Sequence, residues 1–228
     1  EAVRGDTALT YFEYGTLAAL WLLQQAGLDL AVLEVGMGGR LDAVNIVDAD
    51  VSVITTVDVD HQAFLGDDRE TIGMEKAGII RGWKPVVLGE IDPPSSVLRR
   101  AYLVGANALR FGSDFFADAL EDGRWVWRDV ATRLELPAPG LAGPMQRANA
   151  ASAIAALQAL EVTLPGHAWA EGVAQASNPG RLEAFPVNGV EVLLDVGHNP
   201  HAARALAAAL QATPAAGRTL AVLGMLAD

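Results

Sequence analysis

The sequence contains no cysteine and only two lysines, Lys76 and Lys84, among 228 residues. Without cysteine, a disulfide framework and a thiolate metal site are both excluded, and the absence is typical of a reducing compartment. No apolar run reaches the roughly 18 residues of a membrane span, and no signal-peptide pattern is present. We therefore expect a cytoplasmic protein that does not contact the membrane.

Basic residues are scarce, with 16 Lys and Arg against 28 Asp and Glu and a formal net charge of −12. Nucleic-acid binding needs a basic face that releases counterions, so this balance argues against a nucleic-acid partner. Because 51% of the residues are apolar, the chain is expected to be globular, as one large or two small domains. It starts at Glu1 and stops at Asp228, which we interpret as an excerpt of a longer protein.

Several catalytic motifs are also absent. There is no Gly-Lys dipeptide, and hence no Gly-x-x-x-x-Gly-Lys-Ser/Thr phosphate loop within the chain. The Gly-x-Ser-x-Gly and His-Glu-x-x-His motifs are missing too. Nucleophilic hydrolysis therefore has no support from the sequence.

Strand and helix patterns alternate along most of the chain, which favours an α/β fold with a parallel sheet. Short alternating runs between 109 and 136 predict a small antiparallel flap. The central domain is expected over 1–178, a linker over 179–188 and the beginning of a second α/β domain over 189–228. Helices are predicted at 12–26, from Asp67 or Asp68 to about Gly78, 95–104, 146–160, 167–176 and 200–210, and strands at 30–35, 50–57, 85–88, 190–194 and 218–223.

Glu34 and His61 are predicted to lie at the carboxyl ends of two strands. Ligands of open parallel sheets collect at that edge, where a carboxylate and an imidazole could hold Mg²⁺ or Mn²⁺. The alternative is that Glu34 caps a turn and His61 is an ordinary loop residue. Spacing alone favours this simpler interpretation.

Gly36, Gly38 and Gly39 form a glycine-rich turn that would let backbone N–H groups approach an anion or a flat ligand. A tight structural turn explains the glycines equally well. Lys76 is predicted near a helix C-terminus, where a cation complements the helix dipole. Arginine would serve there too, and the chain has 14 arginines, so Lys76 suggests a need for a primary amine. Such an amine could contact phosphate or form a carbamate.

A further group of polar residues follows the predicted boundary between the domains. Arg181 follows a turn and could clamp a phosphate, and Asp195 ends a strand, where a carboxylate can accept ribose hydroxyl bonds. His198 is at the start of the next helix, whose N-terminus favours anions, although an Asn cap before Pro is also a common helix start. Asn149 lies in a helix, where it could equally be structural.

Taken together, these segments resemble the folylpolyglutamate synthase family, in particular its bacterial bifunctional dihydrofolate synthase members, a group similar to the Mur ligases. The resemblance implies a Mur-ligase-like parallel-sheet ATPase domain with an antiparallel flap, followed by the start of a Rossmann-like domain. The segments that carry it are Leu9-Thr-Tyr-Phe-Glu13, Leu33-Glu-Val-Gly-Met-Gly-Gly-Arg-Leu-Asp-Ala-Val-Asn45, Asp60-His61, Phe64-Leu-Gly66, Glu75-Lys-Ala-Gly-Ile79, Pro179-Gly-Arg181 and Asp195-Val-Gly-His-Asn-Pro200.

The resemblance also implies roles at matching positions. Glu34, His61 and a carbamylated Lys76 would hold metal, with two Mg²⁺ expected, and Lys76 and His198 would serve catalysis. The expected nucleotide contacts are Asn149, Arg181 and Asp195. The expected pterin-site residues are Thr10, Tyr11, Phe12, Glu13, Leu41, Asp42 and Ala43.

The implied reaction is ATP-dependent ligation of L-glutamate to dihydropteroate or folate through an acyl phosphate, by a monomer. The family's phosphate loop would precede Glu1, so the displayed chain alone is expected to be inactive. Two alternatives remain open: a Mur-type ligase that acts on a UDP-sugar acid, and a non-catalytic module that binds folate or nucleotide.

Overall fold

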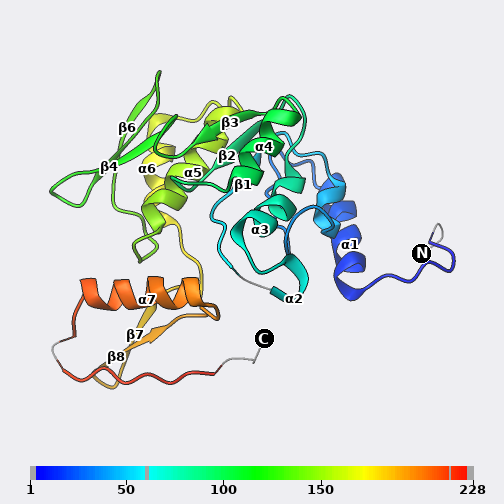
Figure 1. The fold of residues 1–228 in the computed structure, drawn as a ribbon. Helices are drawn as coiled ribbons and strands as arrows, with labels where there is room; N and C mark the ends of the chain where they lie inside the picture. Colours follow the sequence, from blue (N-terminus) through cyan, green and yellow to red (C-terminus); the bar gives the residue numbers. More distant parts are fainter. Residues whose placement is uncertain (1–3, 60–61, 216, 225–228) are drawn as a thin grey trace.

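The centre of the fold is a parallel sheet of three strands in the order β1-β2-β3 (Figure 1). The structure is a computed structural model and describes residues 4–59, 62–215 and 217–224. The strands are β1 (Ser52–Ile54), β2 (Pro85–Leu88) and β3 (Asn107–Arg110), with Ile54 opposite Leu88 and Leu88 opposite Arg110. The prediction of a parallel sheet is confirmed, although the first strand is shorter than the predicted 50–57.

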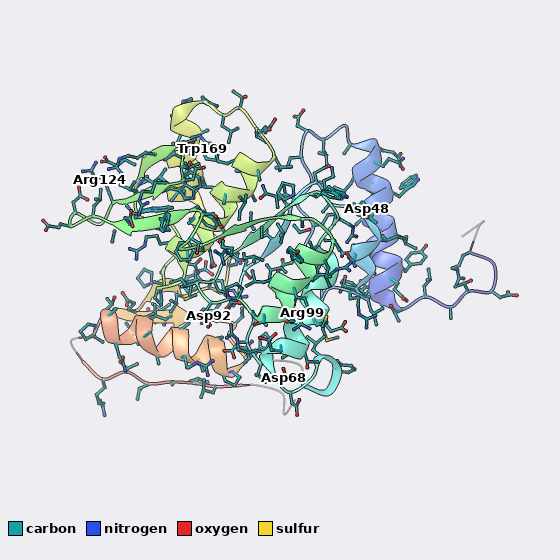
Figure 2. All side chains as sticks on the ribbon, turned by 45° about the horizontal axis from the view of Figure 1, so that its top comes forward. Asp48, Asp68, Asp92, Arg99, Arg124 and Trp169 are labelled. Atoms are coloured by element: carbon teal, nitrogen blue, oxygen red, sulfur yellow. The ribbon has the colours of Figure 1, made fainter. Side chains whose placement is uncertain are left out.

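Helical crossovers connect the three strands, as parallel pairing requires. Asp68, labelled in Figure 2, is the N-cap of the helix at Arg69–Lys76. Its Oδ1 accepts hydrogen bonds from the amides of Glu70 and Thr71 at 2.8 and 2.9 Å. The elements between β1 and β2 are α2 (Gln62–Leu65), α3 (Arg69–Lys76) and η2 (Ala77–Ile79), and α4 (Ser95–Leu103) lies between β2 and β3.

The central strand β2 is covered on both faces. Val86 and Leu88 belong to a buried cluster with residues of α3 and α4, whereas Val87 belongs to a second cluster on the other face. This follows from the two-residue period of a strand, and it explains why the strand reads as a continuous apolar run. Because both faces of the sheet are covered, the ends of β1 and β2 and the loops that follow them remain available for a site.

The second face is covered by α5 (Gln146–Ala159), α6 (Gly166–Gln175) and an antiparallel sheet. That sheet is the predicted flap, with strands β4 (Phe116–Ala119), β5 (Trp125–Arg128) and β6 (Arg133–Leu136). Its anchor is Trp127, whose indole N–H donates to the Ala151 carbonyl of α5 at 3.0 Å. The flap is thus part of the core rather than a loose extension.

The N-terminal helix α1 (Tyr11–Gln25) starts with a capping box. The amide of Glu13 donates to the Thr10 hydroxyl, and the Glu13 carboxylate accepts from the Thr10 amide at 2.7 Å. Gly27 follows the helix with a φ of +62°, which glycine adopts at little cost. The predicted helix 12–26 is confirmed.

Two predicted strands are not strands in the structure. Residues 30–35 and 218–223 lie outside every sheet of the described chain, and most of their apolar side chains are exposed, Val32 by 88% and Val222 by 99%. Their apolar sequences have strand character, but a strand also needs a neighbour that supplies hydrogen bonds. No strand of the described residues pairs with either segment.

Residues 183–212 form a small unit drawn below the sheet in Figure 1. It consists of the antiparallel hairpin β7 (Glu183–Val187) and β8 (Val190–Leu194), followed by α7 (Pro200–Ala212). The predicted linker 179–188 is wrong in this respect, because it contains β7. Asn188 and Gly189, with φ of +48° and +78°, form the two-residue turn typical of hairpins. The division into domains stays a prediction.

No helix in the described ranges is both long enough and apolar enough to cross a membrane.

We predict that the Trp127→Ala substitution lowers the free energy of unfolding by about 3–5 kcal/mol, since it opens a cavity between flap and helix. Trp127 is 1% exposed. The matched control is Trp83→Ala, because Trp83 is 88% exposed, and we expect a change of about 0.5 kcal/mol or less. Urea unfolding of the complete protein measures both. Equal losses would contradict this account of the core.

A carboxylate between α3 and α4 predicts a specific pH dependence. Glu70 accepts the amides of Ser95 and Ser96 at 2.9 and 2.7 Å, and the Ser96 bond above all lowers the pKa of its carboxyl. A lowered pKa in the folded state stabilises the fold above the usual glutamate pKa, and this gain is lost as pH falls through the lowered value.

Glu70→Gln should therefore melt below the parent protein at neutral pH. The difference should begin to shrink at the usual glutamate pKa and vanish only below the lowered pKa of the folded state. Thermal melts of both proteins at matched pH values measure this difference. A difference that does not change with pH would show that the charge of Glu70 is irrelevant.

Candidate functional site

A cleft of about 560 Å³ lies at the carboxyl end of β1. Its wall is formed by residues of the segment 32–38 and by the end of β1 with the loop that follows, within 53–59. Leu65, Ile72 and Lys76 of α2 and α3 and the α7 N-cap Asn199 complete it. The lining residues are Val32, Leu33, Glu34, Val35, Gly36, Met37, Gly38, Val53, Ile54, Thr55, Thr56, Asp58, Val59, Leu65, Ile72, Lys76 and Asn199. The cleft lies at the edge where parallel sheets bind ligands.

Glu34 and Lys76 line this same cleft, although 42 positions separate them. Glu34 is exposed on the segment after residue 30, and the half-buried Lys76 is the last residue of α3. His61, the third predicted metal ligand, lies outside the described residues. Within the described part of the chain, no group of three or more acidic or histidine side chains could hold a metal.

The glycine-rich turn packs directly against the end of α3. A Cβ on Gly39 would lie 2.8 Å from the Glu75 carbonyl oxygen and 2.9 Å from that of Lys76. The Arg40 amide donates to the Glu75 carbonyl at 2.8 Å, and its guanidinium pairs with the Glu75 carboxylate. Gly39 is therefore required for the close approach of two backbone segments, which brings the turn beside Lys76.

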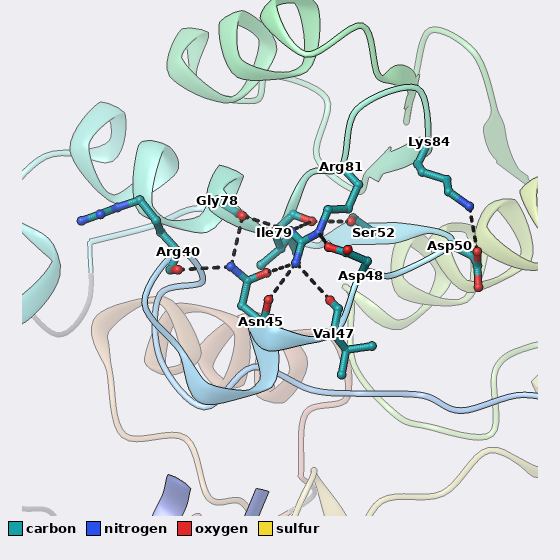
Figure 3. Close-up of polar contacts among 10 residues, drawn as sticks. All are labelled: Arg40, Asn45, Val47, Asp48, Asp50, Ser52, Gly78, Ile79, Arg81 and Lys84. Carbon is teal, nitrogen blue, oxygen red and sulfur yellow. Dashed lines mark hydrogen bonds and ion pairs between the residues drawn. The ribbon is translucent and has the colours of Figure 1, made fainter. Parts of the chain in front are cut away.

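Arg81 ties the segment after the glycine-rich turn to the segment after α3 (Figure 3). Its guanidinium donates to the carbonyls of Asn45 and Val47 at 2.7 and 3.0 Å, and to the Ile79 carbonyl at 3.0 Å. It also pairs with Asp48. The Arg81 side chain is only 20% exposed. One cation thus fixes the spacing between the two segments that flank the cleft.

Asn45 is the partner of Arg81 in this network. Its Oδ1 accepts from Arg81 at 2.9 Å, while its Nδ2 donates to the carbonyls of Arg40 and Gly78 at 3.1 and 3.2 Å. Gly78 must be small here, since a Cβ would lie 2.3 Å from that of Arg40. Asn45 therefore uses its amide to join the same two segments.

The loop after β1 is held by Glu90 and Arg69. The Val57 amide donates to Glu90 Oε1 at 3.2 Å, and Arg69 donates to Glu90 Oε2 and to the Val57 carbonyl, both at 2.8 Å. Burial raises the pKa of the Glu90 carboxyl, against the opposing effect of Arg69. The pair fixes the direction in which the loop leaves the sheet toward the cleft.

Of the predicted pterin-site residues in α1, Phe12 contacts the glycine-rich turn. A Cβ on Gly36 would lie 2.7 Å from the Phe12 ring. Thr10 and Glu13 form the capping box, and Tyr11 is almost fully exposed. The helix start thus lies beside the turn, and its aromatic residues remain accessible.

The other predicted pterin residues belong to the turn itself. Asp42 accepts from the amides of Val44 and Met37 at 2.9 and 3.0 Å, which fixes the turn and starts the short helix η1 (Ala43–Ile46). Leu41 is exposed, and Ala43 is the first residue of η1. A structural role of Asp42 is therefore evident, and its ligand role stays a prediction.

The predicted nucleotide and catalytic residues Asn149, Arg181, Asp195 and His198 do not line this cleft. Asp195 accepts from the Leu182 and Gly197 amides at 3.0 and 2.7 Å, so it connects the turn of Arg181 to the end of β8. The His198 ring contacts the Val196 carbonyl, and Asn149 contacts Gln146. Their roles toward a ligand stay predictions.

Sequence reasoning assigned no role to Thr55, Thr56 and Asp58 of the cleft wall, and it placed Asn199 only at the start of a helix. Thr55 and Thr56 directly follow β1, and this position at a strand end could have identified them. Asn199 caps α7, with its Oδ1 accepting from the Ala202 amide at 2.8 Å. Its sequence signal is a helix cap, which does not indicate a place at a distant cleft.

Comparison with known proteins identifies the class. Residues 180–228 match the family model described as "Mur ligase, glutamate ligase domain". This match assigns residues 180–228 to the Mur ligase family, and the fold of the described chain is consistent with that of Mur ligases. Along its whole length, the chain is homologous to the dihydrofolate synthase/folylpolyglutamate synthases.

The bifunctional enzyme of Escherichia coli K12 is 48% identical over 100% of this chain and 53% of its own length. The Lacticaseibacillus casei folylpolyglutamate synthase is 33% identical over 99% of the chain and 54% of its own. The chain thus spans about half the length of these curated relatives.

Solved structures agree with the fold. The E. coli enzyme "in complex with DHPP and ADP" matches with a TM-score of 0.92 at 48% identity, over 99% of this chain and 53% of that one. A Yersinia pestis homologue "complexed with AMPPNP and Mn ion" matches with a TM-score of 0.84 at 47% identity, over 92% of this chain and 50% of that one. A bifunctional homologue "with Mn, AMPPNP and L-Glutamate bound" matches with the same TM-score, identity and coverage.

We predict that Arg81→Ala lowers the free energy of unfolding by about 2–4 kcal/mol, because several carbonyls and Asp48 lose their donor. Arg81→Lys should restore little, since an ammonium cannot reach both segments with the geometry of a guanidinium. Lys84→Ala is the control, since its pair with Asp50 is exposed (Figure 3), and we expect about 1 kcal/mol or less. Urea unfolding of the complete protein measures all three. Equal effects of the two alanine variants would refute the role of Arg81.

Proposed function

We propose that the complete protein is an ATP-dependent ligase that joins L-glutamate to dihydropteroate, folate or both. The observation that carries this proposal is the single cleft lined by Glu34 and Lys76. It occurs in a chain that is 48% identical along its whole length to an enzyme solved with DHPP and ADP. The relatives are named as synthases that add glutamate, which supports the choice of substrates.

The proposed reaction has two steps. A carboxylate oxygen of the pterin substrate attacks the γ-phosphorus of ATP, so that ADP leaves and an acyl phosphate forms. The amine of L-glutamate then attacks the acyl carbon, the C–O bond to phosphate breaks, and the amine loses a proton as the amide forms. Both steps require the reacting groups to be held close and away from water.

The chain's own residues supply binding and orientation in this proposal. The exposed aromatic residues of α1 and the turn at 41–43 would contact the pterin ring, and Arg181 with Asn149 would contact the nucleotide. Asp195 would accept from the ribose through the lone pairs that its two backbone bonds leave over. His198 would face the reacting groups from the start of α7.

The Mn ion of the Yersinia pestis homologue would have its counterpart in this cleft. Glu34 offers an exposed carboxylate in the cleft, and His61 and Lys76 complete the proposed donor set, with Lys76 converted to a carbamate by carbon dioxide. The donors suit Mg²⁺ or Mn²⁺. When bound, such ions, two of them in our proposal, would neutralise phosphate charge. We further propose that the enzyme acts as a cytoplasmic monomer.

The test uses the complete protein and a panel of three acceptors: dihydropteroate, a reduced folate and a UDP-sugar acid. We expect ADP release that depends on glutamate with one or both of the first two. Turnover with only the UDP-sugar acid would replace the proposal with a Mur-type ligase. Binding without ADP release from any acceptor would replace it with a non-catalytic module.

The two lysines give a matched pair for the site. We predict that Lys76→Arg lowers kcat at least about 100-fold, because a guanidinium keeps the charge but cannot form a carbamate ligand. Lys84→Arg should leave kcat unchanged, because Lys84 only pairs with Asp50 at the surface. ADP release by both variants measures this contrast. Full activity of Lys76→Arg would remove Lys76 from the proposed mechanism.

A further inference from the structure

An ion pair joins the loop after β1 to helix α7. The Arg204 guanidinium donates to Asp58 Oδ2, across 146 positions of sequence. Asp58 lines the cleft, and Arg204 belongs to the unit of residues 183–212. The contact therefore connects that unit to the edge of the parallel sheet.

The Asp58 carboxylate is also oriented by a hydrogen bond within its own loop. Its Oδ1 accepts the Val59 amide at 2.8 Å, which leaves Oδ2 directed to the guanidinium. The loop itself is held by Glu90, which accepts the Val57 amide. The loop thus holds the Asp58 carboxylate in place, and the ion pair with Arg204 positions α7 relative to that loop.

The same helix brings Asn199 to the cleft. Asn199 caps α7 and lines the cleft with Glu34, Lys76 and Asp58. Arg204 lies five positions further along the rigid helix, about 7.5 Å along its axis. Fixing Arg204 on Asp58 therefore fixes the N-terminus of α7, with its positive dipole end, at the cleft.

We propose that the Asp58–Arg204 pair is a positioning contact that holds the start of α7 at the cleft in a closed arrangement of the two units. The Arg204 side chain is 64% exposed and that of Asp58 30%. Exposed pairs contribute little and are screened by salt. Such a pair biases closure without locking it, as a site that must admit substrates and release products requires.

The first experiment measures closure without using activity. In the complete protein, spin labels are placed on Tyr102→Cys of α4 and Gln211→Cys of α7, both exposed positions. The variants are Arg204→Glu, Asp58→Arg and the double reversal, which restores a pair with opposite polarity. Arg218→Glu is the control, because it makes the same charge change at an exposed arginine that forms no ion pair with the described residues.

We expect each single reversal to broaden the distance distribution and shift it toward longer distances. The double reversal should restore the parental distribution, and Arg218→Glu should leave it unchanged. Thermal melts confirm that every variant folds. Parental distances in both single variants, or a double variant no closer to the parent than the singles, would overturn the proposal.

The second experiment rests on the proposed function and uses ADP release. Each single reversal should lower kcat/KM for ATP or glutamate about two- to fivefold, the range for a pair this exposed, mainly through KM. The double reversal should recover it. Arg204→Glu leaves the loop beside the proposed metal residues intact, so its effect reports closure. Unchanged kcat/KM in Arg204→Glu would show that closure does not serve turnover.

The two experiments fail separately. If the parent protein releases no ADP with any acceptor, the proposed ligase function fails, and the distance measurement still decides whether the pair positions α7. If the parent is active but the spin-label distances are unchanged in both Arg204→Glu and Asp58→Arg, the positioning role fails and the ligase proposal stands.

Discussion

The arrangement of the cleft depends on the Arg81 guanidinium. It donates hydrogen bonds to carbonyls of two segments that are distant in sequence. One segment contains Asn45 and Val47, and the other contains Ile79. With Asn45 it sets the distance between the glycine-rich turn and the end of α3, where Gly39 lies against the carbonyl of Lys76. Glu34, just before the turn, is placed relative to Lys76 through this network. A charged, multidentate donor in a largely buried position is costly to remove, so the spacing is rigid.

The parallel sheet determines where polar residues of different segments come together. β2 is buried on both faces, which orders the layers on either side and leaves the strand ends as the edge where polar side chains gather. Residues far apart in sequence, such as Glu34 and Lys76, share one cleft because the glycine-rich turn that follows Glu34 packs against the end of α3.

Elements whose signals are local were predictable from the sequence. The helix start at Asp68, the Thr10–Glu13 capping box and the apolar run of β2 each depend on residues within a few positions. The segments at 30–35 and 218–223 were not, because strand character says nothing about whether a neighbouring strand is present. β7 was also missed, although Asn188-Gly189 is a local hairpin signal.

The candidate site divides in the same way. Glu34 and Lys76 were singled out from an expected strand end and from lysine scarcity, and both line the same cleft. The strand expected before Glu34 is absent from the described chain, and the roles of both residues stay predictions. Arg81 and the Asp58–Arg204 pair depend on contacts across 33 and 146 positions, which a single sequence does not reveal. The place of Asn199 at a cleft lined mainly by residues 32–76 is equally invisible in the sequence. The basic residues also show why composition does not predict contacts, because at least eight of the 16 pair with carboxylates within the fold.

That matching bears on how a chain of net charge −12 could bind anions. At least seven of the 14 arginines pair with carboxylates, namely Arg40, Arg69, Arg81, Arg110, Arg124, Arg128 and Arg204. Lys84 pairs with Asp50. Arg181 has no carboxylate partner among the described residues, and it follows Gly180 in a strained turn beside Asp195. Attraction of an anion must therefore come from a few placed groups rather than from the whole surface. The start of α7 belongs to the unit that the proposed Asp58–Arg204 contact holds at the cleft, and Arg181 lies just before that unit. Closure would therefore bring positive groups toward a cleft whose lining includes the carboxylates of Glu34 and Asp58.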